Sequence, residues 1–142
     1  MRNEVIKEAL EWYETPYHHQ AKVKHVGVDC AQFVAAIAEN TGLVKEKINI
    51  QSYSVEWHLH NREEKMLEII RSFGCEERNI DDREPGDILT FKFGRVNSHM
   101  GILVEPTRFI HARIDIGKVV INELSGDWLK RLNKVFKFPH II

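Results

Sequence analysis

The stretch GVDCAQFVAAIAEN, residues 27–40, places a cysteine at the start of an apolar helical pattern. Asp29 is a residue type that caps helix N-termini, and Gly42 follows where such a helix would end. The apolar residues recur at the spacing of one helix face, namely Cys30, Phe33, Val34, Ile37 and Ala38. The stretch therefore predicts a buried helix whose first turn holds a cysteine.

One further helix is predicted before this one and another after it. Residues 3–13 have an apolar side and stop at Thr15-Pro16, and residues 61–73 show a similar pattern. The polar segment 17–28 is predicted to be a loop. The N-terminal half is therefore expected to be helical.

After Pro85-Gly86 the chain changes to short β-branched or aromatic runs separated by turn residues. Five strands are predicted, at 87–93, 99–104, 108–113, 118–123 and 134–138, with a short helix near 127–132. Helices followed by strands indicate an α+β fold, with the N-terminal helices packed on a five-stranded, mainly antiparallel sheet. We expect a single domain spanning residues 1–142.

Composition excludes several classes of protein. The 142 residues carry a net charge of −1 and no basic stripe with interleaved aromatics, so a nucleic-acid partner is not expected. No apolar run approaches the roughly 20 residues of a membrane-spanning helix. The first residues lack the features of a secretory signal, so synthesis in the cytoplasm is expected. Two cysteines are too few for a disulfide framework, and no cofactor is expected.

The candidate catalytic residues are Cys30, His99 and His111. A cysteine in the first turn of a helix is expected to have a lowered pKa, because unpaired N–H groups and the helix dipole favour the thiolate. The backbone N–H of Cys30 is then a candidate oxyanion-hole donor. Period-two alternation places His99 and His111 on strands that can be neighbours, so one ring can act as base and the other can orient it.

Each of these residues also has a structural interpretation, as a buried thiol or a hydrogen-bonded strand histidine. The same three residues are an acceptable zinc ligand set, which is a separate alternative. Cys75 has no nearby histidine and is predicted to have no catalytic role. The remaining histidines of interest are assigned to solvated loops or the surface, namely His18, His19, His25, His58 and His60.

Five ordered motifs resemble the NlpC/P60 family of papain-like cysteine peptidases, which cut peptidoglycan. In chain order they are Thr15-Pro16-Tyr17, Gly27-Val28-Asp29-Cys30, Pro85-Gly86-Asp87-Ile88, Ser98-His99-Met100-Gly101-Ile102 and Phe109-Ile110-His111-Ala112. The chain is most similar to the short, single-domain branch encoded by phages and prophages. The resemblance implies a papain-like fold in which Cys30 is the nucleophile, His99 the base and His111 the orienting residue.

The resemblance also implies a substrate, an amide bond in a peptidoglycan stem peptide, of the D-γ-glutamyl–diamino-acid type. Tyr17, Asp29 and Gln32 are then expected to form the oxyanion and substrate-binding side of the site. Ala31-Gln32 replaces the family's usual Ser-Gly after the nucleophile, and Gln32 is expected to narrow the groove. Two alternatives share the scaffold: a phage-tail assembly module that binds tail proteins, and an acyltransferase with the same triad.

Overall fold

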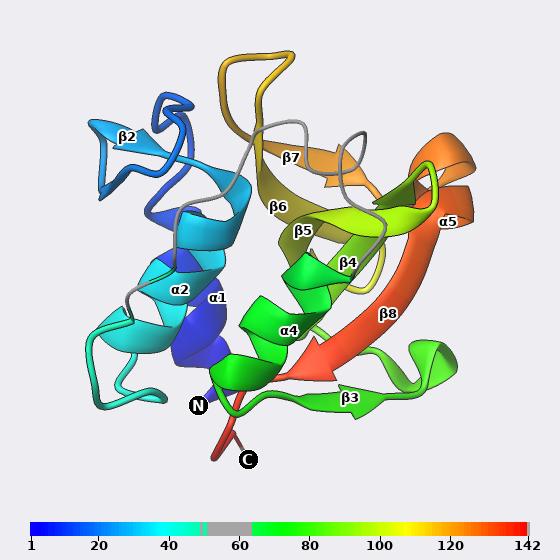
Figure 1. The fold of residues 1–142 in the computed structure, drawn as a ribbon, viewed down its shortest axis with the longest axis horizontal. Helices are drawn as coiled ribbons and strands as arrows, with labels where there is room; N and C mark the ends of the chain where they lie inside the picture. Colours follow the sequence, from blue (N-terminus) through cyan, green and yellow to red (C-terminus); the bar gives the residue numbers. More distant parts are fainter. Residues whose placement is uncertain (49, 51–63, 142) are drawn as a thin grey trace.

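The computed structural model describes residues 1–48, 50 and 64–141. Helices α1 (Arg2–Leu10), α2 (Cys30–Asn40) and α4 (Lys65–Ser72) lie together beside a twisted sheet (Figure 1). These are the three predicted helices, although positions 61–63 of the third lie outside the described residues, as do His58 and His60. None of the helices in the described ranges is long and apolar enough to cross a membrane.

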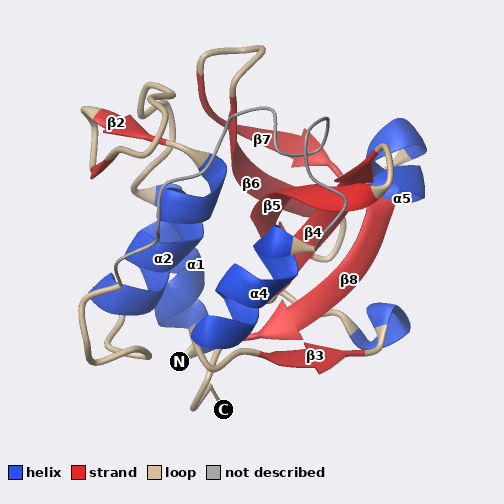
Figure 2. Cartoon of the chain, in the orientation of Figure 1, coloured by secondary structure: helices blue, strands red, loops and turns tan. Residues whose placement is uncertain are grey.

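The main sheet has the strand order β3-β8-β4-β5-β6-β7, and every pair in it is antiparallel. The five predicted strands are present, as β4 (Ile88–Phe93), β5 (Val96–Glu105), β6 (Arg108–Arg113), β7 (Lys118–Glu123) and β8 (Leu132–Lys137). The short helix α5 (Gly126–Arg131) precedes β8 (Figure 2). The α+β class with a mainly antiparallel sheet is therefore confirmed.

The structure adds a sixth strand to the five that were predicted. β3 (Glu76–Arg78) pairs with the edge of β8, and its three charged residues give no alternating apolar signal. The predicted loop before α2 also holds a two-stranded sheet, β1 (Lys22–Val23) with β2 (Gly27–Val28). Both additions are too short for a hydrophobic period to reveal them.

The sheet has an apolar cluster on each face. Met100, Ile102 and Ile110 belong to the cluster that also contains the residues of α1, α2 and α4. Leu103 and Phe109 belong to the cluster on the other face, against which Trp128 of α5 packs. Because side chains alternate along a strand, His99 and His111 lie on this second face, with Leu103 and Phe109.

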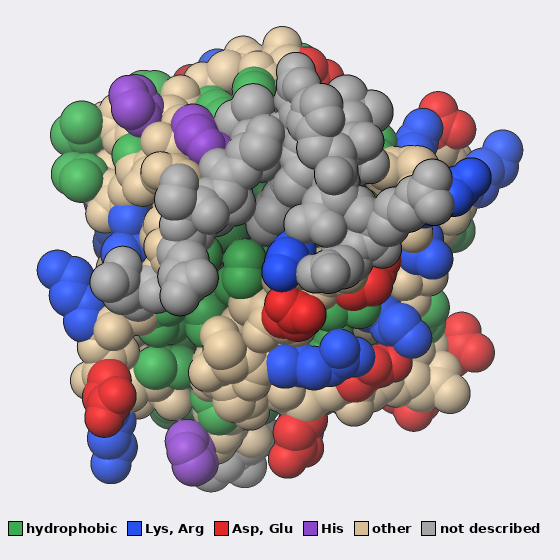
Figure 3. All heavy atoms as spheres, viewed as in Figure 1, with side chains coloured by type: hydrophobic (Ala, Val, Ile, Leu, Met, Phe, Trp, Pro, Cys, Tyr) green, Lys and Arg blue, Asp and Glu red, His purple; other side chains and the backbone are tan. Residues whose placement is uncertain are grey.

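A buried carboxylate attaches α1 to the start of β4. Asp87 is fully buried, and it accepts hydrogen bonds from Arg2 (2.8 Å) and Arg78 (3.1 Å). A buried charge needs such partners, because an unpaired one would lose its solvation without compensation. Elsewhere acidic and basic side chains are intermixed on the surface, as Figure 3 shows for one face, in agreement with the small net charge.

Candidate active site

The first turn of α2 is fixed by Asp29. Its Oδ1 accepts a hydrogen bond from the Gln32 N–H (2.9 Å), so Asp29 is the N-cap of α2, as predicted. Its Oδ2 accepts a hydrogen bond from the Gln20 N–H (2.6 Å). His19 Nδ1 lies 3.7 Å from the same Oδ2. The carboxylate therefore joins the preceding loop to the helix that begins at Cys30.

The thiol of Cys30 lies between α2 and β5. The N–H groups of Met100, Ala31 and Cys30 itself interact with the sulfur and favour its thiolate. Burial opposes them and is the largest effect, followed by the negative charge of Asp29, so the pKa of Cys30 is raised to about 12. The expectation of a lowered pKa was therefore wrong for the resting structure, because Cys30 is only 7% exposed.

The two histidines are hydrogen-bonded to each other. His99 Nε2 of β5 lies 2.7 Å from His111 Nδ1 of β6. Gly101 makes this approach possible, because a Cβ there would lie 2.9 Å from the Cβ of His111 and 2.8 Å from the carbonyl oxygen of Ile110. The His99–His111 pairing expected from alternation is thus present in the structure.

An aromatic cage surrounds the imidazole pair. The Trp128 ring lies 5.7 Å from that of His99 and 4.9 Å from that of His111, between centroids, and Phe109 lies 4.3 Å from His111. Burial in this cage, with a smaller effect from the positive charge of Arg113, lowers the pKa of His99 to about 4. Burial and the neighbouring His99 hold the pKa of His111 well below its usual value. Both rings are therefore neutral at neutral pH.

The Cys30 sulfur faces the backbone of β5 at Met100, the residue that follows His99. The ladder between β5 and β6 ends at the pair Ile102–Ile110, so the N–H of Met100 is free to face the Cys30 sulfur. In the described part of the chain, the hydrogen bonds of the rings are to each other and to Asn122, and none joins a ring to the thiol. At rest the site is thus a neutral thiol beside a neutral imidazole pair.

The other predicted site residues lie around the start of α2. Tyr17 N–H donates to the carbonyl of Gly117 (2.8 Å), and burial together with the charges of Cys30 and Asp29 raises the pKa of the Tyr17 phenol. The Tyr17 side chain is therefore close to the thiol. Gln32 is buried, with 8% of its surface exposed, and it lies two residues after Cys30 on α2.

The described ranges 1–48, 50 and 64–141 contain no group of three or more His, Cys, Asp or Glu side chains arranged to hold a metal ion. His99 Nε2 and His111 Nδ1 are directed at each other. These two nitrogens therefore do not converge on a common ligand position in this structure.

The model of the NlpC/P60 family matches residues 14–137, a range that includes all six predicted site residues. The chain belongs to the NlpC/P60 family. Members of this family are generally cysteine peptidases and peptidoglycan hydrolases, and some are non-catalytic. A comparison with curated proteins finds no match.

Solved NlpC/P60 structures share the fold. A lipoprotein-like family member from Staphylococcus aureus is 19% identical (TM-score 0.69), over 99% of this chain and 42% of that chain. The peptidoglycan hydrolase RipB of Mycobacterium tuberculosis is 14% identical (TM-score 0.64), over 99% of this chain and 65% of RipB. RipD of the same organism, a non-catalytic protein adapted to peptidoglycan binding, is 7% identical (TM-score 0.60), over 96% and 95%. This chain thus spans less than two thirds of the length of the S. aureus protein and of RipB.

The structure reveals site residues that sequence reasoning missed in this NlpC/P60 chain. Asn122 Oδ1 lies 2.8 Å from His111 Nε2, and Arg113 donates to the same oxygen over 3.3 Å. Asn122 interrupts the apolar run of β7, which was the only signal for it. Its register with β6 cannot be read from the sequence. Trp128 was predicted only as part of a short helix, with no role at the site.

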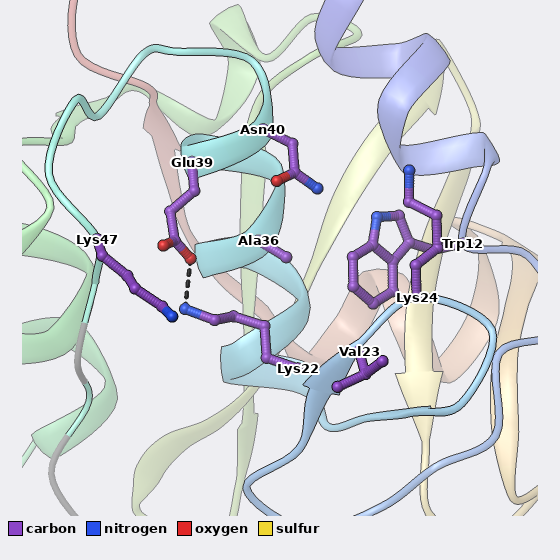
Figure 4. Close-up of a pocket in the computed structure, with 8 residues that line it drawn as sticks. All are labelled: Trp12, Lys22, Val23, Lys24, Ala36, Glu39, Asn40 and Lys47. Atoms are coloured by element: carbon purple, nitrogen blue, oxygen red, sulfur yellow. Dashed lines mark hydrogen bonds and ion pairs between the residues drawn. The ribbon is translucent and has the colours of Figure 1, made fainter.

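A cavity of about 320 Å³ lies away from this site, beside β1 and α2 (Figure 4). It is lined by Trp12, Lys22, Val23, Lys24, Ala36, Glu39, Asn40 and Lys47. Lys22 is ion-paired with Glu39, and Lys24 bonds to Glu8 (2.8 Å) and Glu11 (3.1 Å). Because none of the proposed catalytic residues lines it, the cavity is not where the thiol chemistry would occur.

Proposed function

We propose that this chain is a cysteine peptidase that hydrolyses an amide bond in peptidoglycan stem peptides. The observation that supports it most directly is local: the thiol of Cys30 lies at the start of a capped helix, against the β5 backbone next to His99. His99 is in turn hydrogen-bonded to His111. A nucleophile, a base and a group that orients the base are the parts that acyl transfer needs.

The proposed reaction begins with transfer of the Cys30 proton to His99 Nδ1, the ring nitrogen that is not bonded to His111. The two groups are not hydrogen-bonded at rest, and such bonds often tighten only when substrate is present. The thiolate then attacks the scissile carbonyl, and the backbone N–H of Cys30 with the Tyr17 phenol stabilises the oxyanion. His99 protonates the leaving amine, and water releases the acyl group from Cys30.

The bond and the setting are part of the same proposal. The family resemblance favours the D-γ-glutamyl–diamino-acid bond, and the likeness of the motifs to those of the phage and prophage branch favours phage tail proteins as partners. In that setting we propose that the protein meets the cell wall through lysis, a virion or a partner protein.

Digestion of purified peptidoglycan tests this function. Wild type should release soluble muropeptides that mass spectrometry assigns to one cleaved bond, and Cys30→Ala should release none. Cys75→Ala is the matched control, because Cys75 is also a buried thiol whose pKa burial raises to about 12. Equal release by wild type and Cys30→Ala, with both proteins folded, would contradict the proposal.

A second candidate is binding to peptidoglycan or to tail proteins without cleavage. The neutral resting thiol supports it, since a raised thiol pKa disfavours the nucleophilic form. The same peptidoglycan experiment separates the two: wild type that sediments with the polymer and releases nothing would favour binding. An acyltransferase would instead form a new amide when an acceptor amine is added to the digestion.

A further inference from the structure

The imidazole pair has a second set of partners on β6 and β7 that determines where its protons lie. Asn122 Oδ1 is 2.8 Å from His111 Nε2, and Arg113 Nη1 donates to the same Oδ1 over 3.3 Å. A guanidinium has only donors. If the Asn122 amide were turned, its NH₂ group would face the N–H of Arg113, so Arg113 holds the oxygen of the amide toward His111.

This orientation propagates through both rings. An oxygen that faces His111 Nε2 requires that Nε2 bears the proton, and a neutral imidazole has only one N–H. His111 Nδ1 is then an acceptor, so His99 Nε2, at 2.7 Å, must donate to it. With its proton on Nε2, neutral His99 has its lone pair on Nδ1.

Arg113 is itself held in place on two sides. Its Nε donates to Asp115 Oδ1 (3.0 Å), and its Nη2 pairs with the other oxygen of that carboxylate. Its guanidinium carbon lies 5.4 Å from the centroid of the Trp128 ring that covers His111. A forked ion pair and a stacked ring leave little freedom for the group that orients Asn122.

We propose that Arg113 and Asn122 are positioning residues that fix the proton order of the His99–His111 pair, so that His99 presents the Nδ1 lone pair as the base. The consequence for turnover rests on the proposed peptidase function. The proton order itself is a property of the folded chain and can be measured without any substrate.

Nitrogen NMR of protein labelled with ¹⁵N-histidine measures this order directly. In the wild type at neutral pH, both rings should bear their proton on Nε2. Arg113→Met frees the Asn122 amide to turn, and Asn122→Leu removes the acceptor, so both variants should show Nδ1-protonated forms in both rings. Arg113→Lys, which keeps a group that can only donate, should restore the wild-type order. Arg108→Met, which removes an exposed ion pair on the same strand, is the control and should change neither ring.

Turnover provides the second measurement. A wrong histidine tautomer costs about 10⁴-fold in kcat where the orienting group contacts the base directly. Asn122 acts through one more ring, so we expect kcat to fall about 10- to 100-fold in Arg113→Met and Asn122→Leu, with KM little changed. Arg108→Met should match the wild type.

Two results would overturn the inference: a proton on Nδ1 of either ring in the wild type, or an unchanged proton order in folded Arg113→Met. Arg113 is partly exposed, so this variant is expected to fold even if Asn122→Leu does not. The expected proton order in a protein that releases no muropeptides would support the inference and count against the proposed function alone.

Discussion

Replacing Gly101 with alanine should separate strand β6 from strand β5 at the imidazole pair. A Cβ at this position would lie 2.8 Å from the carbonyl oxygen of Ile110, 2.9 Å from the Cβ of His111 and 3.2 Å from Cδ2 of Phe109. Two of these atoms belong to well-buried side chains and one to the backbone of β6, so none can move alone. Gly101 is not among the glycines with positive φ, and the cost is therefore steric rather than conformational.

The size of the effect follows from these distances. Restoring ordinary contact requires a shift of about 0.6 Å, and overpacking a buried site by one methyl group costs about 1–3 kcal/mol. The same shift would lengthen the His99–His111 bond from 2.7 Å toward the limit of a hydrogen bond. Because a displacement of about 1 Å can reduce a rate about 100-fold, we expect about a tenfold lower kcat for Gly101→Ala.

Urea unfolding and peptidoglycan turnover per folded molecule measure the two effects. Gly42→Ala is the matched control, because Gly42 has a φ of 77° and open space around it. Alanine there should cost about 1 kcal/mol through backbone strain and leave turnover unchanged. Wild-type stability and turnover in Gly101→Ala would refute the argument that this glycine sets the distance between the rings.

Three further predictions concern charge. The free energy of unfolding should fall as the pH drops from 6.5 toward about 4, because the unfolded chain protonates His99 while burial keeps the folded ring neutral. This difference corresponds to about 3 kcal/mol, and urea titrations should show a smaller loss for His99→Phe; equal losses would count against it. Asp29→Asn should lower the pKa of Cys30, which would be seen as faster alkylation of the thiol at a given pH. It should also reduce the free energy of unfolding by about 1–3 kcal/mol, because one of the two backbone N–H groups bound to Asp29 loses its acceptor. An unchanged titration of the thiol would contradict this prediction. Trp128→Ala should raise the pKa of His99 by admitting water, so the acid limb of kcat/KM should move upward from about pH 4; a limb that stays in place would exclude this role for the ring.

The elements with a strong period were predictable. The α2 helix begins at Cys30 behind the predicted Asp29 cap, and strands β6 and β7 have the predicted bounds. For α2 the helical spacing of the apolar residues agrees with their burial, and for β6 and β7 the short β-branched or aromatic runs end at turn residues. The His99–His111 contact also followed from alternation, once the two strands were assumed to be neighbours.

What the sequence could not provide depends on register and burial. The bond from His111 to Asn122 requires the alignment of β6 with β7, which no residue of either strand specifies alone. The pKa of Cys30 is raised, whereas the position at the helix N-terminus predicted that it would be lowered, because the burial of the thiol has the larger effect. Local chemistry can thus be inferred from motifs, whereas its electrostatic state requires the packed structure.

The central claim is that Cys30 forms a covalent acyl intermediate. Intact-protein mass spectrometry of wild type, acid-quenched during turnover of a stem peptide, tests it most directly. We predict a mass increase equal to the acyl half of the peptide, located on Cys30 by fragmentation and missing from Cys30→Ala but not from Cys75→Ala. Peptide cleavage with no adduct, or with the adduct on another residue, would contradict the account.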